Sequence, residues 1–147
     1  MEIKVKKISN EAYIPKRGSD GAVGYDLKCP RDVIIHKGRN LVQLDLAVEI
    51  PVGYHIKIEP RSGFSLKGFE GANGNRFNAN VLHGCVDSDY RGNVGVIVQS
   101  EDEFLLARGT RIAQAILYCN PTMEFTEVEE LTKTERNSGG FGSTGTK

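Results

Sequence analysis

The sequence lacks several features that mark whole classes of protein. It holds no apolar run long enough to span a bilayer, and its start, Met1–Lys6, lacks the apolar segment of a signal peptide. Its 19 basic and 19 acidic side chains cancel, which leaves no overall field of the kind that draws a protein to nucleic acid or to a membrane. We therefore expect a cytoplasmic protein, or a nuclear one in a eukaryote, without direct nucleic-acid or membrane contacts.

Cysteine and histidine are too scarce and too scattered to build a framework. Cys29, Cys85 and Cys119 are odd in number and show no C-x-x-C spacing, which argues against both a disulfide scaffold and a structural zinc site. The histidines lack metal-binding spacing as well. Cys85 lies in the most polar segment of the chain, where it is either a reactive thiol or a small buried apolar residue; the second interpretation is favoured.

A sustained helical period is also missing, and alternation of apolar and polar residues takes its place. It is clearest over residues 42–50, where one face is apolar and the other includes Asp45. Strands are predicted at residues 3–6, 42–50, 54–59, 94–98, 104–106 and 112–118. Residues 62–67 are predicted to form one or two helical turns capped by Ser62, and residues 68–79 a loop. Many short strands in 147 residues indicate one all-β sandwich or barrel.

The last part of the chain changes character. From Asn137 to Lys147 it is almost entirely Gly, Ser, Thr and Asn around the single aromatic Phe141. Such a segment buries too little apolar surface to order itself, so we expect a folded domain over residues 1–135 and a flexible arm over residues 136–147. A disordered tail is one interpretation. An aromatic residue in a flexible arm can also stack on a base and cap a pocket.

The segment Gly84–Asn93 (GCVDSDYRGN) concentrates two carboxylates, a tyrosine and an arginine between apolar runs. Three further segments combine arginine with small, amide or hydroxyl residues. They are Arg61–Gly63, Arg111–Gln114 and Arg136–Gly145. Arginine forks and flexible backbone N–H groups are the donors that phosphates take. The sequence therefore predicts a site for several phosphates without a single P-loop.

Together with Gly24–Leu27, these segments resemble the homotrimeric dUTP pyrophosphatase (dUTPase) family. The five motifs, in order, are similar to Gly24–Leu27, Pro60–Gly63, Gly84–Gly92, Arg111–Gln114 and Arg136–Gly145. The resemblance covers nearly the whole chain. It implies a jelly-roll-like distorted β-barrel, assembled as a homotrimer, that hydrolyses dUTP to dUMP and pyrophosphate with Mg²⁺. Such an activity limits uracil incorporation into DNA and supplies dUMP for dTTP synthesis.

The resemblance also implies roles in the third motif. Asp87 would be the general base that orients water for attack on the α-phosphorus, although Asp before Ser is also common in turns. Tyr90 would lie beneath the sugar and leave no space for a 2′-hydroxyl; the alternative is a core tyrosine. The backbone of hairpin 81–86 would read uracil. Its implied substrate-binding residues are Val81, Gly84, Cys85 and Val86. Asp89 is expected in a structural role, and the role of Arg91 stays open.

The other motifs are implied in phosphate and metal binding. Arg61 and Arg136 would contact phosphates directly. Ser62 and Gly63 would add hydroxyl and backbone donors, and the arm would close through Phe141, Gly142 and Ser143. Mg²⁺ would bind mainly to triphosphate oxygens, because it keeps much of its hydration.

Asp26 and Gln114 would touch the waters of the magnesium ion rather than the ion itself, and Gln114 would also bind substrate. Asp26 could equally cap the turn before Leu27. Arg111 is expected as a buried ion-pair partner.

In the family each pocket is shared by three subunits: one supplies motifs two and four, another the hairpin with Asp87, and a third the arm. Two departures stand out. Val81 replaces an Asn of many members, and the stretch between Lys67 and Gly84 is several residues longer than usual, so residues 68–80 leave room for a regulatory protein partner.

Two other functions compete with dUTP hydrolysis. One is a dUTP-sensing binding module with weak hydrolysis. The other is the related dCTP deaminase activity, for which Asp87–Tyr90 lacks the required glutamate.

Overall fold

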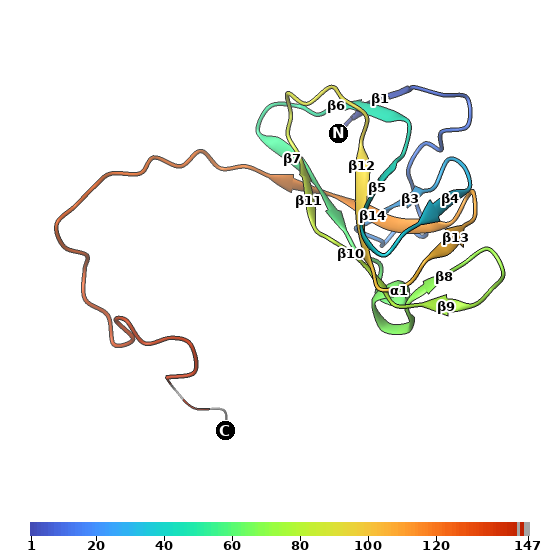
Figure 1. Cartoon of the computed structure of the whole chain (residues 1–147). Coiled ribbons are helices and arrows are strands. Elements are labelled where there is room, and N and C mark those ends of the chain that lie inside the picture. The colour runs from blue at the N-terminus through green and yellow to red at the C-terminus, as the bar shows by residue number, and fades with distance from the viewer. Residues whose placement is uncertain (144, 146–147) are drawn as a thin grey trace.

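The computed structural model describes residues 1–143 and 145. In this part of the chain, fourteen strands and one short helix form a β-sandwich from which the C-terminal segment extends (Figure 1). The strands are β1 Lys4–Lys7, β2 Lys16–Arg17, β3 Tyr25–Lys28, β4 Val33–Ile35, β5 Gly38–Gln43, β6 Leu46–Glu49, β7 Tyr54–Glu59, β8 Phe69–Glu70, β9 Arg76–Phe77, β10 Ala79–Val81, β11 Gly84–Val86, β12 Gly95–Ser100, β13 Phe104–Leu106 and β14 Arg111–Cys119, and the helix is α1 Ser62–Lys67. The all-β class predicted from the sequence is confirmed.

Two antiparallel sheets enclose the core. The larger has the order β11-β7-β14-β3-β2 and the smaller β10-β12-β5, while β1-β6, β13-β4 and β8-β9 form pairs. Val96 and Val98 of β12 face inward from the smaller sheet, and Leu27 and Ile112 face inward from the larger one; all four are buried. The alternation of the sequence therefore places one face of each strand in the core.

The predicted strand over residues 42–50 is divided in two. Its apolar residues are all buried, as the alternation predicts, but β5 pairs with β12 whereas β6 pairs with β1. Asp45 lies between the two strands with φ of 56°. This left-handed backbone, which Asp tolerates better than most residues, redirects the chain from one sheet to the next. Asp45, predicted on the polar face, is only 6% exposed.

The helix and the segment after it also differ from prediction. Arg61, not Ser62, is the N-cap residue of α1, and its side chain makes no capping hydrogen bond. Residues 68–79, predicted as a loop, contain the β8–β9 hairpin, in which Phe69 pairs with Phe77. Phe77 stacks on Phe104 with ring centroids 4.5 Å apart, and Phe69 is buried. Aromatic packing therefore orders a segment whose Gly and Asn content indicated a loop.

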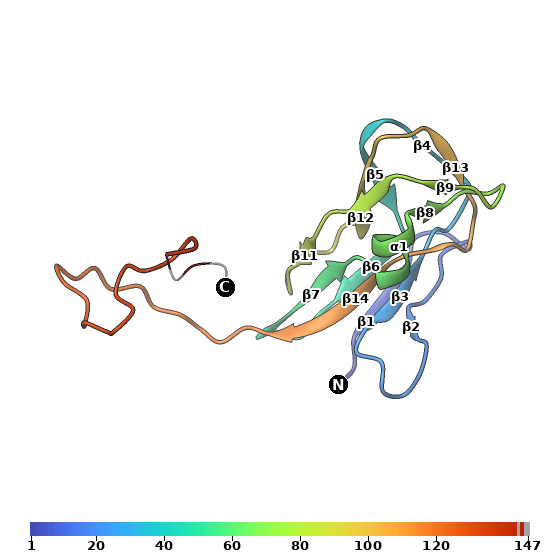
Figure 2. The same cartoon turned by 90° about the horizontal axis from the view of Figure 1, so that it is seen from below.

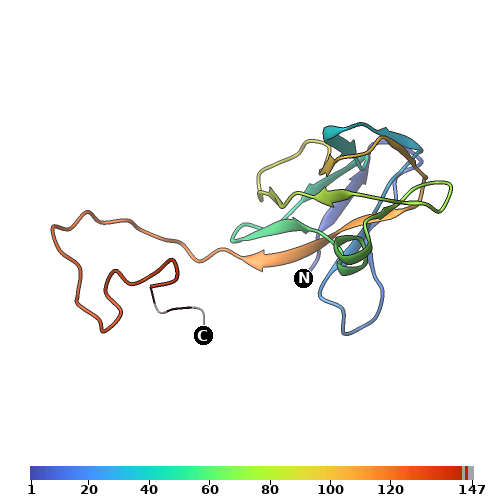
Figure 3. The same cartoon turned by 60° about the horizontal axis from the view of Figure 1, so that its bottom comes forward.

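The C-terminal segment lies apart from the sandwich. After β14 ends at Cys119, residues 120–143 form neither strand nor helix and run outward as an arm, visible in Figure 1, Figure 2 and Figure 3. Residues 120–135, predicted as part of the domain, lie outside it in the single chain. Over the described residues, no helix has the length and apolar character needed to cross a membrane.

Candidate active site

Gly84, Cys85 and Val86 of the predicted 81–86 hairpin line one cavity of about 370 Å³, the hairpin cavity. The hairpin prediction itself is wrong, because β10 pairs with β12 and β11 pairs with β7, in different sheets. The wall of the cavity is formed by Leu41, Gln43, Ile58, Leu82, Gly84, Cys85, Val86, Asp87, Tyr90, Asn93, Val94, Gly95 and Ile97. Strand β11 supplies three of the predicted residues because it pairs with β7 at the edge of the larger sheet. Val81 lies elsewhere: its side chain is buried in the core, so it has only its backbone to offer a ligand.

Tyr90 is held in place by the loop that follows it. Its hydroxyl donates to the carbonyl oxygen of Asn93 at 3.1 Å. A Cβ on Gly92 would lie 2.4 Å from the same hydroxyl, so the ring needs glycine at this position. Tyr90 is 46% exposed and lines the cavity, which rules out the alternative of a core tyrosine.

Asp87 begins a tight turn at the cavity wall. Its carbonyl oxygen accepts a hydrogen bond from the backbone N–H of Tyr90 at 3.2 Å, while its side chain is exposed. Arg91 supports the same turn, since one of its nitrogens donates to the carbonyl oxygens of Ser88 at 2.6 Å and of Tyr90 at 3.1 Å. Arg91, whose role the sequence left open, thus makes internal contacts of this loop. Asp89 is exposed.

Cys85 is exposed, and the favoured sequence interpretation of a small buried apolar residue is wrong for it. The reason lies in its position on β11, where Gly84 opposes Ile58 and Cys85 opposes Lys57. Alternation along this edge strand turns Val86 into the core and Cys85 outward. Cys29, in contrast, is fully buried, and burial raises the pKa of its thiol.

A second group of predicted residues meets at β3, β14 and the start of α1. Asp26 forms an ion pair with Arg61, with 3.0 Å between the carboxylate and Nε, and it accepts a hydrogen bond from a terminal nitrogen of Arg111 at 3.3 Å. Arg61 also donates to the backbone carbonyl of Arg111 at 3.2 Å. Arg111 is an ion-pair partner as predicted, but its side chain is 53% exposed rather than buried. Two arginines around one carboxylate leave this cluster positively charged.

Gln114 ties three motifs together. Its amide nitrogen donates to the carbonyl oxygen of Pro60 at 3.0 Å. A Cβ on Gly24, the residue before β3, would collide with Oε1 of Gln114, so glycine at this position leaves the amide free to stay where it is. Ser62 and Gly63 lie exposed in the first turn of α1, where backbone N–H groups lack intrahelical partners.

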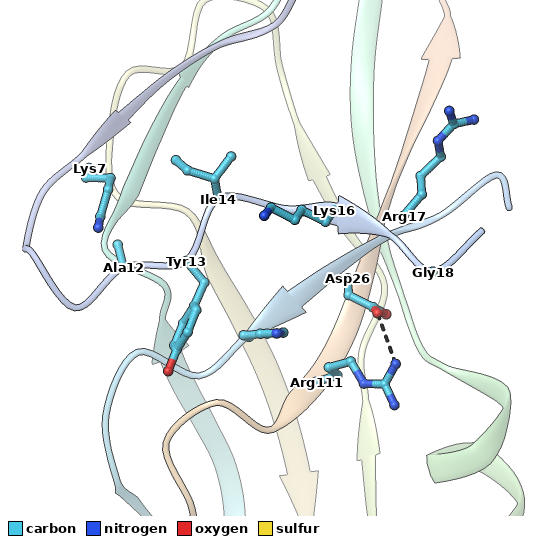
Figure 4. A pocket seen from close by; sticks show the side chains of 10 residues that line it. Lys7, Ala12, Tyr13, Ile14, Lys16, Arg17, Gly18, Asp26 and Arg111 are labelled. Atoms are coloured by element: carbon cyan, nitrogen blue, oxygen red, sulfur yellow. Dashed lines mark hydrogen bonds and ion pairs between the residues drawn. The ribbon is translucent and has the colours of Figure 1, made fainter. Parts of the chain in front are cut away.

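A basic cavity of about 520 Å³ borders Asp26 and Arg111 (Figure 4). Four further cations line it: Lys7, Lys16, Arg17 and Lys28. Tyr13 forms part of its wall, and Lys28 Nζ lies 5.3 Å from the centre of that ring. Asp26 is the acidic residue of the wall and is already paired with two arginines, so this side of the molecule favours a polyanion.

The third group of predicted residues lies on the arm. Arg136 Nε donates to the carbonyl oxygen of Gly139 at 2.8 Å, and the Ser143 amide donates to the carbonyl oxygen of Gly140 at 3.0 Å. Phe141 is fully exposed and has φ of 51°. Residues 144, 146 and 147 lie outside the described residues. The arm thus holds Arg136, Phe141, Gly142 and Ser143 away from both cavities of its own chain.

The donor set fits a magnesium ion held mainly by phosphates. Over the described residues, no three His, Cys, Asp or Glu side chains come together as a protein cage for a metal. Asp26 is a half-buried carboxylate within a positive cluster, and Gln114 lies beside it in the sheet, where the two residues pair across β3 and β14. A carboxylate and an amide suit contacts to metal-bound waters.

Sequence reasoning missed one group beside the first cavity. Asp45 is buried against Arg31 and Asn93, and Asn93 lines the cavity. Asp45 belongs to none of the five motifs, so the only signal was a charged residue at the centre of the longest alternating run.

Comparisons with known proteins identify the family to which the chain is similar. The dUTPase family model matches residues 10–145. The chain is 44% identical over 147 residues to the mitochondrial deoxyuridine 5'-triphosphate nucleotidohydrolase of Dictyostelium discoideum, with 98% of this chain and 77% of that protein covered. It is 43% identical over 150 residues to the deoxyuridine 5'-triphosphate nucleotidohydrolase of Nautilia profundicola, with 99% of both covered.

Among solved structures, the dUTPase of Staphylococcus bacteriophage 80alpha with dUPNHPP matches with a TM-score of 0.84, 26% identity and 99% of each chain covered. The jelly-roll-like β fold predicted from the sequence is confirmed by this likeness. With the family model and both relatives spanning nearly its whole length, the chain belongs to the dUTPase family.

Proposed function

We propose that the chain is a dUTP diphosphatase that hydrolyses dUTP to dUMP and pyrophosphate. The observation that carries this proposal is the cavity whose wall brings together Asp87, Tyr90 and the β11 backbone in a chain of this family. The relatives from Dictyostelium discoideum and Nautilia profundicola carry this activity in their names. The phage 80alpha dUTPase holds a dUTP analogue on the same fold.

Asp87 is the general base of the proposed reaction. Its exposed carboxylate at the cavity wall accepts a proton from a water molecule as that water attacks the α-phosphorus. A bond forms between the water oxygen and the α-phosphorus, and the bond from that phosphorus to the oxygen bridging the α- and β-phosphates breaks. Pyrophosphate leaves with the bonding electrons, and dUMP remains.

The cavity wall reads the nucleoside. Backbone groups of Gly84, Cys85 and Val86, which line the cavity, pair with the uracil edge in the proposed complex, and the segment that joins β10 to β11 lies near C5. Tyr90, fixed over Gly92, offers its ring to the sugar and excludes a 2′-hydroxyl sterically. A site with defined donors and acceptors rejects mispaired analogues strongly, because their polar groups are left unpaired.

The Asp26 cluster and the basic cavity receive the triphosphate. Arg61 and Arg111 supply positive charge beside the exposed start of α1, where Ser62 and Gly63 offer hydroxyl and backbone donors. Mg²⁺, when bound, neutralises the triphosphate oxygens and orients them. Asp26 and Gln114 would contact the waters of a bound ion. The arm closes the site through Arg136 and Phe141.

The active sites are shared between the subunits of a homotrimer. In one chain the hairpin cavity and the Asp26 cluster belong to separate cavities, and the arm reaches neither. The arm also exposes apolar side chains, such as Phe125 at 89% and Leu131 at 86%, which a neighbouring subunit can cover. A single chain therefore lacks a complete site.

Two experiments test this proposal. Pyrophosphate release is measured over dUTP, dTTP, dCTP and UTP, and we expect turnover of dUTP alone; equal turnover of UTP would contradict the role of Tyr90. Mixed trimers are then prepared from Asp87→Asn chains and chains truncated after Glu135. Partial recovery of activity is expected, because at some sites an intact Asp87 from a truncated chain meets an intact arm from an Asp87→Asn chain. No recovery would refute shared sites.

A further inference from the structure

A hydrogen-bonded network runs from the buried Asp45 to the Tyr90 ring. One carboxylate oxygen of Asp45 accepts a hydrogen bond from a terminal nitrogen of Arg31. The other accepts a hydrogen bond from the side-chain amide nitrogen of Asn93 at 3.2 Å. The Asn93 carbonyl oxygen in turn accepts from the Tyr90 hydroxyl at 3.1 Å. Asp45 itself does not line the cavity, whereas Asn93 and Tyr90 do.

The backbone around Asp45 holds the same loop from the other side. The Leu44 amide donates to the Val94 carbonyl oxygen at 2.9 Å, and the Val94 amide donates to the Leu46 carbonyl oxygen at 2.7 Å. Asn93 is thus fixed both through its side chain and through its neighbour in sequence. A loop attached at two adjacent residues to a bend of the core has little freedom to move.

The place of the Tyr90 ring depends on this loop. The ring lies so close to Gly92 that any Cβ there would collide with it, and its hydroxyl is bonded to the next residue, Asn93. A shift of the Gly92–Asn93 backbone therefore shifts the ring by a similar amount. A side chain that discriminates sterically between a hydrogen and a hydroxyl is sensitive to such a displacement.

We propose that Asp45, supported by Arg31, is a positioning residue that fixes the Tyr90 ring through Asn93 and thereby sets the preference for deoxyribose over ribose. This inference rests on the proposed function, in which Tyr90 contacts the sugar. Asp45 touches neither substrate nor the reacting atoms and acts only through the loop. Its burial at the bend between β5 and β6 couples the core of the sandwich to the selectivity of the cavity.

The test compares substrate selectivity in Asp45→Asn with that of the unmodified protein. Asn keeps the size of the side chain and tolerates the left-handed backbone, but it weakens the bonds to Arg31 and Asn93. We expect the ratio of kcat/KM for dUTP to that for UTP to fall by about tenfold, chiefly through a gain in UTP turnover. Ser100→Ala is the matched control, because Ser100 is also a buried polar residue but lies outside the cavity wall.

A double-variant cycle and a spectroscopic measurement separate positioning from general stability. Tyr90→Phe removes the end of the network, so adding Asp45→Asn to it should lower the selectivity ratio no further. In protein with isotope-labelled tyrosine, Asp45→Asn should shift the Tyr90 ring resonance without ligand, whereas Ser100→Ala should leave it in place. Arg31→Gln should change the selectivity ratio and the Tyr90 resonance in the same direction but by less. If Asp45→Asn fails to fold, Arg31→Gln alone provides the test.

Two results would overturn the inference. One is an unchanged selectivity ratio and an unchanged Tyr90 resonance in a folded Asp45→Asn or Arg31→Gln protein; the other is full additivity in the double variant. Failure of the proposed function looks different, since the unmodified protein would then release no pyrophosphate from dUTP. The ring resonance reports on the network in either case.

Discussion

Two aspartates of this chain lie in opposite environments, Asp26 in the cluster at β3 and Asp87 at the hairpin cavity. Asp26 is half-buried and paired with Arg61 and Arg111. Asp87 is exposed and forms no ion pair with any described residue. A carboxylate held by two cations can anchor the strands that carry it, whereas an exposed carboxylate at a cavity wall is free to contact a ligand or a water molecule. The same functional group is thus paired with two arginines in one place, and in the other it is the proposed general base.

The largest effect is expected where the chemistry lies. Asp87→Asn removes the base while keeping the shape of the side chain, so kcat for dUTP should fall by about 10²- to 10⁴-fold. The free energy of unfolding should change by less than about 0.5 kcal/mol, because the side chain is exposed. Steady-state pyrophosphate release and chemical denaturation measure the two quantities. Unchanged turnover in this variant would remove Asp87 from the mechanism.

Asp26→Asn should show the opposite balance. Arg61 and Arg111 lose their anionic partner, so we expect the free energy of unfolding to fall by about 1–3 kcal/mol. Activity should fall as well, with a higher Mg²⁺ requirement, because the contact to metal-bound water weakens. Denaturation midpoints and a magnesium titration of turnover test this. A variant as stable as the unmodified protein would show that the two ion pairs do not anchor β14 to β3.

A methyl group at Gly24 probes the same cluster without changing charge. It would collide with Oε1 of Gln114, a flexible side-chain end that can move away. We therefore expect little loss of stability but a fall in kcat/KM for dUTP of about tenfold, because the amide is misplaced. Gly18→Ala is the control, since no atom lies within 4 Å of a Cβ built there. Equal kinetics in the two variants would contradict this role for Gln114.

The smallest effect concerns pH and Asp45. Burial raises the pKa of this carboxyl, but the nearby Ser9 hydroxyl and hydrogen bonds from Arg31 and Asn93 outweigh burial and hold the pKa below its ordinary value. Asp45 therefore adds stability above the unfolded-state pKa of about 3.9, and this stability is lost as the pH falls through the lower folded-state value. The gap in Tm between the unmodified protein and Asp45→Asn should close below about pH 4. A gap independent of pH would exclude this ionisation.

The alternation of residues 42–50 shows which structural features the sequence could predict and which it could not. It predicted correctly which side chains are buried, because burial of one strand face is a local pattern. It did not predict the bend at Asp45, because that bend depends on β1 and β12 as partners of the two halves. Cys85 teaches the same lesson: its exposure follows from the place of β11 at a sheet edge, which no neighbour in sequence reveals.

By itself, the sequence determined the all-β class and the motifs of the dUTPase family, because alternation and motif order are written in the chain. Only the tertiary structure decided that Asp26 is paired with two arginines and that Tyr90 is tied to Asp45. It also divided the candidate site residues among two cavities and an arm. Contacts between segments far apart in the chain create buried charges and cavity walls, and these contacts exist only once the strands have paired and packed.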